Sequence, residues 1–145
     1  MKEELFELGV KGLIQNAEGK VLLLRTDKSQ VVGNIKESYW DIPGGRVHKD
    51  GSIRETLERE IAEETGLVGL ETFKFITMAI HPKVRLPVTG GGEARLILSI
   101  YLCTMKEVEP VTLSSEHLEA AWFALEEVRA KLKSNYPLEL VEAIK

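Results

Sequence analysis

Three acidic residues, Glu60, Glu63 and Glu64, fall within about one turn of a segment that is predicted to be helical, residues 52–65. At about 100° per residue, Glu60 and Glu64 border the apolar stripe of this helix, whereas Glu63 extends the acidic patch toward solvent. Neighbouring like charges repel one another, and partial burial increases the cost. A divalent cation would neutralise them, and carboxylate oxygens with no soft ligand nearby favour Mg²⁺ or Mn²⁺. The spacing therefore indicates a metal site on one face of the helix.

An acidic helix can also be explained without a ligand. Charge runs usually mark solvated faces, and arginines on the same helix can pair with glutamates one turn away, as Arg59 can with Glu55. Arg54 offers a further partner. If this alternative holds, replacing Glu64 with glutamine changes stability and nothing else. The residues that flank the acids favour the metal site.

These flanking residues form a motif. From Gly45 to Leu67 the chain reads GRVHKDGSIRETLEREIAEETGL, which strongly resembles the Nudix box, G-x5-E-x7-R-E-U-x-E-E-x-G-U with U an aliphatic residue. The matching positions are Gly45, Arg59, Glu60, Ile61, Glu63, Glu64, Gly66 and Leu67. The flanks are similar to the family as well, with a Trp-x-x-Pro-Gly-Gly approach at 40–45 and a later Trp122-Phe123 followed by Leu-Glu-Glu-Val at 125–128.

One position departs from the box. Gly51 stands where the family has its first glutamate, with Asp50 just before it. In the family that glutamate commonly supports the arginine of the box, so Arg59 needs another partner. Asp50 or Glu55 could take that place.

The resemblance implies an α+β Nudix fold, a mixed β-sheet sandwiched between α-helices, and hydrolysis of a nucleoside diphosphate linked to another moiety. By match to the motif, the Mg²⁺ ligands would be Glu60, Glu63, Glu64 and the carbonyl of Gly45, with Mn²⁺ as a substitute. Arg59 would orient a carboxylate of the cluster or contact phosphate. Metal ions suit this reaction because they screen the pyrophosphate and lower the pKa of the attacking water.

Two residues are candidates for the general base, because family members use a base either from the helix or from a later loop. Glu60 is the helix candidate. Glu116 is the loop candidate, six residues before Trp122, and the alternative for it is an exposed loop acid. Glu93 is a weaker third choice, since a charge at the start of a strand can merely protect an edge.

Three further residues are candidates for binding substrate. Trp40 can stack on a base, although an aromatic residue beside a Pro-Gly-Gly turn more often packs in the core. Lys83 and Arg85 can reach a phosphate, although solvated loop charges explain them equally simply. Pro82, 15 residues beyond Leu67, gives a weak link to the ADP-ribose branch of the family.

The remaining elements follow from apolar periodicity and turn residues. Residues 5–15 and 20–26 are predicted as a hairpin around Asn16–Gly19, followed by a polar loop and a short extended piece at 39–43. Strands are predicted at 68–80, 94–105 and around Trp122, a loop at 81–92, and helices at 125–134 and after Pro137. Ser52 with Glu55 can cap the start of the acidic helix, and Gly66 can end it.

The composition bounds the class of protein. The chain has 145 residues, 43% hydrophobic and 29% charged, so a single domain spanning residues 1–145 is expected. A net charge of −4 does not favour binding to a nucleic-acid duplex or an anionic membrane. Cys103 is the only cysteine, and no apolar stretch is long enough for a signal peptide or membrane span. These features predict a cytoplasmic protein. Its apolar strands could supply the interface of a homodimer.

Two substrate classes and one non-enzymatic class remain. A nucleoside triphosphate, oxidised or otherwise damaged, is slightly favoured over ADP-ribose or another sugar nucleotide, because the chain is short. The competing class is a sensor domain that binds a nucleotide without cleaving it, suggested by Gly51 alone.

Overall fold

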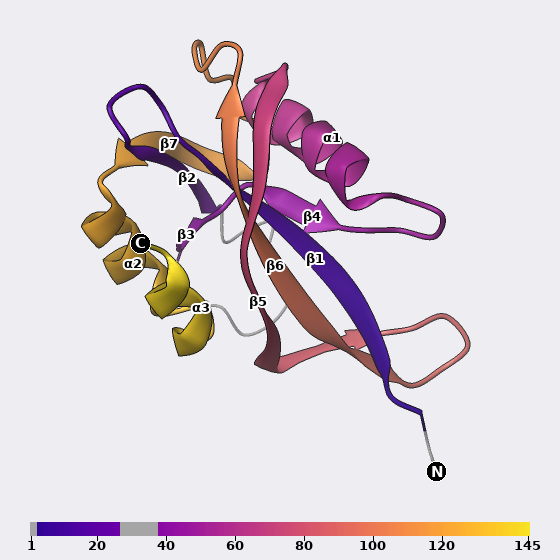
Figure 1. The fold of residues 1–145 in the computed structure, drawn as a ribbon. Helices are drawn as coiled ribbons and strands as arrows, with labels where there is room; N and C mark the ends of the chain where they lie inside the picture. Colours follow the sequence, from indigo (N-terminus) through magenta and orange to yellow (C-terminus); the bar gives the residue numbers. More distant parts are fainter. Residues whose placement is uncertain (1–2, 27–37) are drawn as a thin grey trace.

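The computed structural model describes residues 3–26 and 38–145 (Figure 1). The predicted polar loop after residue 26 lies almost wholly outside the described residues. In chain order the elements are β1 (Leu5–Ile14), β2 (Val21–Thr26), β3 (Trp40–Asp41), β4 (Gly44–Arg46), α1 (Ile53–Thr65), β5 (Leu70–Pro87), β6 (Glu93–Met105), β7 (His117–Phe123), α2 (Leu125–Leu132) and α3 (Leu138–Ala143). None of the helices in the described part of the chain combines the length and apolar character that crossing a membrane requires.

The strands form two sheets between two layers of helix. A four-stranded sheet has the order β4-β1-β6-β5, in which β1 and β6 run parallel and the other pairs antiparallel. A three-stranded antiparallel sheet has the order β3-β2-β7. Helix α1 lies on one side of the strands, and α2 and α3 lie on the other (Figure 1). The predicted α+β Nudix fold is confirmed, with its strands divided over two sheets.

Strand β2 shows why both helical layers are needed. Val21 and Leu23 pack into the core beneath α2 and α3, whereas Leu22 and Leu24 pack into the core beneath α1. All four side chains are fully buried. A strand buried on both faces reads as a continuous apolar run, which is the pattern of this segment.

The predicted hairpin is only partly correct. The turn forms as expected, because the Asn16 side chain accepts hydrogen bonds from the backbone N–H groups of Glu18 and Lys20 and Gly19 has a φ of 80°. The two strands then separate into different sheets, and a single bridge, Gln15 with Val21, joins them. Parallel pairing with β6, at residues distant in sequence, draws β1 away from its neighbour.

The loop predicted at 81–92 is wrong for its first part. Strand β5 resumes pairing with β6 after a register shift between Ile80 and Arg85 and runs to Pro87. Prolines are tolerated here because β5 is the edge strand of its sheet and one side of its backbone needs no partner. The turn is therefore confined to residues 88–92.

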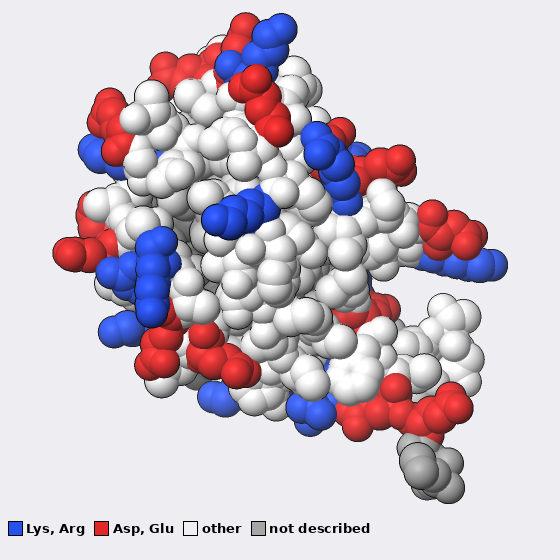
Figure 2. Space-filling view, in the orientation of Figure 1, with Lys and Arg blue, Asp and Glu red and all other residues white. Residues whose placement is uncertain are grey.

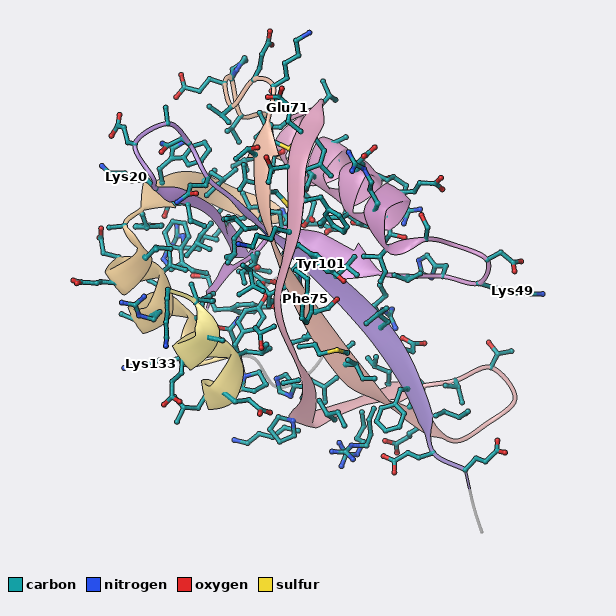
Figure 3. All side chains as sticks on the ribbon, viewed as in Figure 1. Lys20, Lys49, Glu71, Phe75, Tyr101 and Lys133 are labelled. Atoms are coloured by element: carbon teal, nitrogen blue, oxygen red, sulfur yellow. The ribbon has the colours of Figure 1, made fainter. Side chains whose placement is uncertain are left out.

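The outward face of β5 is apolar. Phe75, Met78 and Ile80 are exposed, and the middle of this face carries few charged side chains (Figure 2). Phe75 lies beside Tyr101 of β6, with ring centroids 5.7 Å apart (Figure 3). The apolar strands expected to serve a homodimer are thus accessible, and the dimer itself stays a prediction.

Cys103 provides a test of the core. It lies fully buried in the core beneath α1, and burial raises the pKa of its thiol to about 12. At pH 8 only about one molecule in 10⁴ would carry the reactive thiolate. We expect the folded protein to resist iodoacetamide at pH 8 and to be alkylated quantitatively in urea, as measured by mass spectrometry. Rapid alkylation without denaturant would contradict this placement.

Candidate functional site

Helix α1 presents its acids as the helical wheel predicts. Ser52 caps its start by accepting a hydrogen bond from the backbone N–H of Glu55, and Gly66 ends it in the left-handed conformation. Leu57 and Ile61 are fully buried and fix which face meets the sheet. At the border of that face the side chains of Glu60 and Glu64 are 20% and 13% exposed, whereas Glu63 is 61% exposed.

The Gly44–Gly45 dipeptide on β4 receives two of these acids. A Cβ atom on Gly45 would lie 2.5 Å from the carboxyl carbon of Glu60, so this carboxylate lies directly against the Gly45 backbone. The backbone N–H of Gly44 donates a 2.8 Å hydrogen bond to Oε1 of Glu64. The close approach of Glu60 requires a residue without a side chain at position 45, whereas Gly44 is required by the close approach of β1.

Glu64 has the most unusual environment of the three. Its Oε2 lies 3.3 Å from Nε2 of His117, on β7. Burial raises the pKa of Glu64 to about 7, and the negative charges of Asp41 and Glu60 add to that effect, while Lys11 and the Gly44 N–H oppose it. A bound cation would favour the ionised form of this carboxyl and so oppose the effect of burial on its pKa.

Arg59 pairs with two acids of its own helix. Its guanidinium lies 3.4 Å from Glu60 and 3.8 Å from Glu63. The suggested partners, Asp50 and Glu55, are not among its contacts in the described structure, and the helix pair that does form nearby joins Arg54 to Glu58. Arg59 thereby relieves the like-charge repulsion in this turn.

The described residues contain no group of three His, Cys, Asp or Glu side chains close enough to hold a metal ion. Glu60 and Glu64 meet at the two glycines, and Glu63 points away with Arg59. The donor set still fits a hard divalent cation, since it consists of carboxylate oxygens and the Gly45 carbonyl oxygen. The three-glutamate ligand set stays a prediction.

The whole chain matches a known family. The family model described as NUDIX domain matches residues 5–143. The chain belongs to the Nudix family. This confirms the predicted family.

Individual Nudix proteins resemble the chain to different extents. The crystal structure of the MutT protein from Methanosarcina mazei Go1 is 28% identical, covers 99% of this chain and 94% of its own, and superposes with a TM-score of 0.69. An 8-oxo-dGTP diphosphatase from Buchnera aphidicola is 36% identical over 56 residues, which is 37% of this chain and 44% of that protein. The m7GpppN-mRNA hydrolase NUDT17 of Xenopus laevis is 43% identical over 61 residues, 42% of this chain and 20% of that protein. The chain thus matches less than half the length of either curated relative.

Beside the Nudix helix the structure places a histidine that the sequence did not single out. His117 contacts Glu64, and its Nδ1 lies 3.2 Å from the hydroxyl of Ser114. Burial lowers the pKa of His117, so the neutral form is favoured. The predicted residue, Glu116, is its immediate neighbour and is exposed in the turn before β7. Its role as general base stays a prediction.

A buried polar cluster next to the Nudix box was also not predicted. Asp41 lies 3.5 Å from the ammonium of Lys11 and accepts a hydrogen bond from the hydroxyl of Tyr136. The sequence carries one signal for it, a lysine among the apolar residues in the second half of β1.

Trp40 takes the packing role that was the alternative for it. Its ring meets Phe123 edge to face, with centroids 5.0 Å apart. The ammonium of Lys131 lies over both rings, at 5.3 and 4.6 Å from their centroids. This arrangement joins β3, β7 and α2 and supports packing as the explanation of Trp40.

Lys83 and Arg85 are not brought to the Nudix box. They lie on β5, three strands away from β4, which corresponds to about 14 Å across the sheet. Val10 of β1 pairs with both Gly45 of β4 and Ser99 of β6, so Ser99 marks the level of Gly45 on β6. Arg85 pairs with Arg95, which lies four residues along β6 from Ser99. That offset adds about 13 Å along the strands. Contact of this pair with a pyrophosphate held at Gly45 is not supported.

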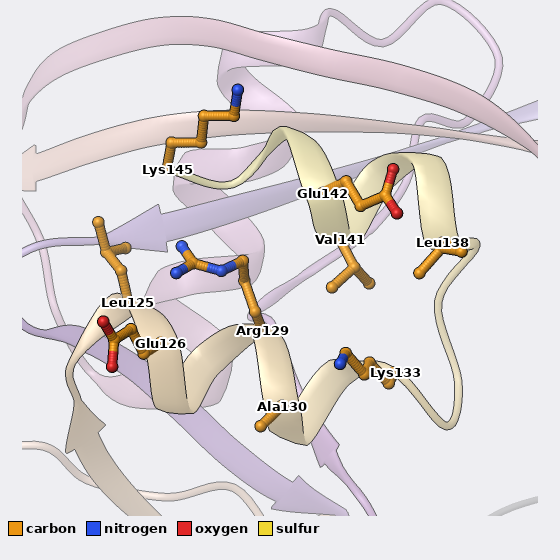
Figure 4. A pocket seen from close by; sticks show the side chains of 9 residues that line it. All are labelled: Leu125, Glu126, Arg129, Ala130, Lys133, Leu138, Val141, Glu142 and Lys145. Atoms are coloured by element: carbon orange, nitrogen blue, oxygen red, sulfur yellow. The ribbon is translucent and has the colours of Figure 1, made fainter.

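A groove between α2 and α3 lies apart from these residues (Figure 4). It has a volume of about 760 Å³ and is lined by both apolar and charged side chains. None of the predicted site residues lines it. The predicted acids Glu60 and Glu64 lie instead at the junction of α1, β4 and β7.

Proposed function

We propose that the protein is a Mg²⁺-dependent pyrophosphohydrolase that cleaves a nucleoside diphosphate linked to another moiety. The observation that carries the proposal is the meeting of Glu60 and Glu64 at the Gly44–Gly45 dipeptide. Two half-buried acids that meet at a glycine backbone form a scaffold for a cation that binds phosphate. We further propose a nucleoside triphosphate, oxidised or otherwise damaged, as the substrate, because the matched Buchnera relative is an 8-oxo-dGTP diphosphatase.

In this proposal the residues of the site have three roles: holding the metal ion, accepting a proton from water and orienting the carboxylates. Glu60 and Glu64, with Glu63 and the Gly45 carbonyl, would hold the metal ion, which when bound supplies Lewis acidity and a lowered water pKa. Glu60 or Glu116 would take the proton from water. Arg59 would keep the carboxylates of the helix oriented, since it already contacts Glu60 and Glu63.

A single screen tests the proposal. The protein is incubated with Mg²⁺ in ¹⁸O water with dGTP, 8-oxo-dGTP and ADP-ribose, and the products are analysed by mass spectrometry. We expect turnover of at least one triphosphate, with one ¹⁸O in the product that marks the phosphorus attacked, and loss of turnover in EDTA. Exclusive cleavage of ADP-ribose would overturn the substrate proposal. Tight binding without any turnover would instead identify a sensor.

A further inference from the structure

Lys11 lies against Gly44, the glycine whose N–H donates to Glu64. It is paired with Gly44 in the antiparallel register of β1 and β4. A Cβ atom on Gly44 would lie 2.9 Å from both Cα and Cδ of Lys11, so the stem of the lysine packs flat against this glycine. The ammonium extends beyond this contact to Asp41 of β3.

Asp41 holds this ammonium in place. Its Oδ2 lies 3.5 Å from Nζ of Lys11, while its Oδ1 accepts hydrogen bonds from the backbone N–H of Ile42 and from the hydroxyl of Tyr136. The side chains of Lys11 and Asp41 are 17% and 20% exposed, so the pair is recessed but not sealed from solvent. Burial disfavours the charged lysine, yet Asp41 and Glu64 outweigh it and raise the pKa of Lys11. The ammonium is therefore positive at neutral pH.

The hydrogen-bonding capacity of Lys11 is not used up by this partner. An ammonium has three N–H donors, and a 3.5 Å ion pair is longer than the 2.7–2.9 Å typical of a charge-assisted hydrogen bond. Among the described residues, Asp41 is its only ionic partner within 4 Å. Other cations near the box are engaged elsewhere, Arg46 with Glu7 and Arg59 with its own helix.

We propose that Lys11 is a substrate-binding residue whose ammonium donates a hydrogen bond to a phosphoryl oxygen beside Gly44, with Asp41 as the positioning residue. The inference rests on the proposed function, because a pyrophosphate would bring several negative charges to a site already lined by Glu60 and Glu64. A fixed point charge at the edge of the site offsets part of that repulsion. Lys11, which stands among the apolar residues in the second half of β1, thereby gains a role that core packing does not give it.

The primary test compares Lys11→Met, Lys11→Arg and the control Lys20→Met, since Lys20 is an exposed turn lysine paired with Glu18. Calorimetry measures binding of inorganic pyrophosphate in Mg²⁺, and kinetics measure KM and kcat. We expect Lys11→Met to weaken pyrophosphate binding and raise KM by about 10- to 100-fold, the range for a lost hydrogen bond to a charged group. Lys11→Arg should retain most of the affinity, and Lys20→Met all of it. Unchanged pyrophosphate affinity in Lys11→Met overturns the inference.

A structural role is separated by a double variant. Lys11→Met leaves Asp41 recessed without its counter-charge, and Lys11→Met with Asp41→Asn removes that charge. A double variant that recovers the melting temperature but not pyrophosphate affinity supports substrate binding. Recovery of affinity together with stability assigns Lys11 to structure and overturns the inference.

A measurement on the unmodified protein completes the test. The side-chain ¹³Cε resonance of Lys11, assigned by its absence in Lys11→Arg, should shift when pyrophosphate is added with Mg²⁺, and not with Mg²⁺ alone. No shift overturns the inference. A protein that hydrolyses nothing but shows the shift loses the proposed function and keeps the phosphate contact.

Discussion

Replacing Glu64 with glutamine is expected to remove nearly all Mg²⁺-dependent turnover while the fold is preserved. Glutamine has the same shape and its amide oxygen can still accept the Gly44 N–H, but it cannot bring negative charge to a cation. Losing a metal ligand removes several kcal/mol of transition-state stabilisation, so kcat should fall by about 10²- to 10⁴-fold. Steady-state kinetics with the substrate found in the screen measure this loss.

Stability should respond in the opposite direction. The pKa of Glu64 is about 7 in the folded chain against an ordinary 4.5, so its ionisation penalises folding increasingly as pH rises from 4.5 to 7. A neutral glutamine avoids that penalty, and the metal-free variant at pH 8 should melt at the same temperature as wild type or higher. Glu58→Gln is the matched control, because Glu58 lies on the same helix, exposed and paired with Arg54. If Glu64→Gln retains more than a tenth of the rate, Glu64 is not a metal ligand.

The elements that the sequence predicted well are those set by local rules. Helix α1 begins and ends where its cap residues predict, because an N-cap hydroxyl and a left-handed glycine act within a few residues of the helix. The burial of Glu60 and Glu64 follows from their angle to Leu57 and Ile61. The match to the family motif added Gly45 of β4 to the residues predicted for the site.

The features that could not be predicted depend on contacts between distant residues. His117 reaches Glu64 because β7 pairs with β2, and Asp41 meets Tyr136 across 95 residues of chain. Nothing in the local pattern distinguishes these residues from ordinary strand and loop positions. Likewise, the division of β1 and β2 over two sheets results from the pairing of β1 with β6. The spacing of residues along the chain does not predict which distant strands pair.

Replacing Gly45 with alanine is expected to reduce kcat strongly with little loss of stability. The added methyl group would lie 2.5 Å from the carboxyl carbon of Glu60, a separation that Cβ atoms do not tolerate. Because Glu60 is a flexible side chain with 20% exposure, it can rotate away at little cost, and the fold should survive. The rotation would remove one acid from the site, so kcat should fall by about 10²-fold or more. Kinetics and thermal melting on the same preparation measure both effects.

Two other glycines make this result specific. In Gly44→Ala the new Cβ would lie 1.9 Å from the carbonyl oxygen of Val10, which is backbone and cannot rotate aside, so that variant should lose stability as well as activity. In Gly51→Ala the nearest atom would be the His48 carbonyl oxygen at 3.1 Å, which a small shift accommodates, so activity should be kept. Wild-type rates in Gly45→Ala would show that Glu60 does not act from its position against the Gly45 backbone. A loss of rate confined to Gly45→Ala, with melting temperature retained, would locate the chemistry where the acids of α1 meet β4.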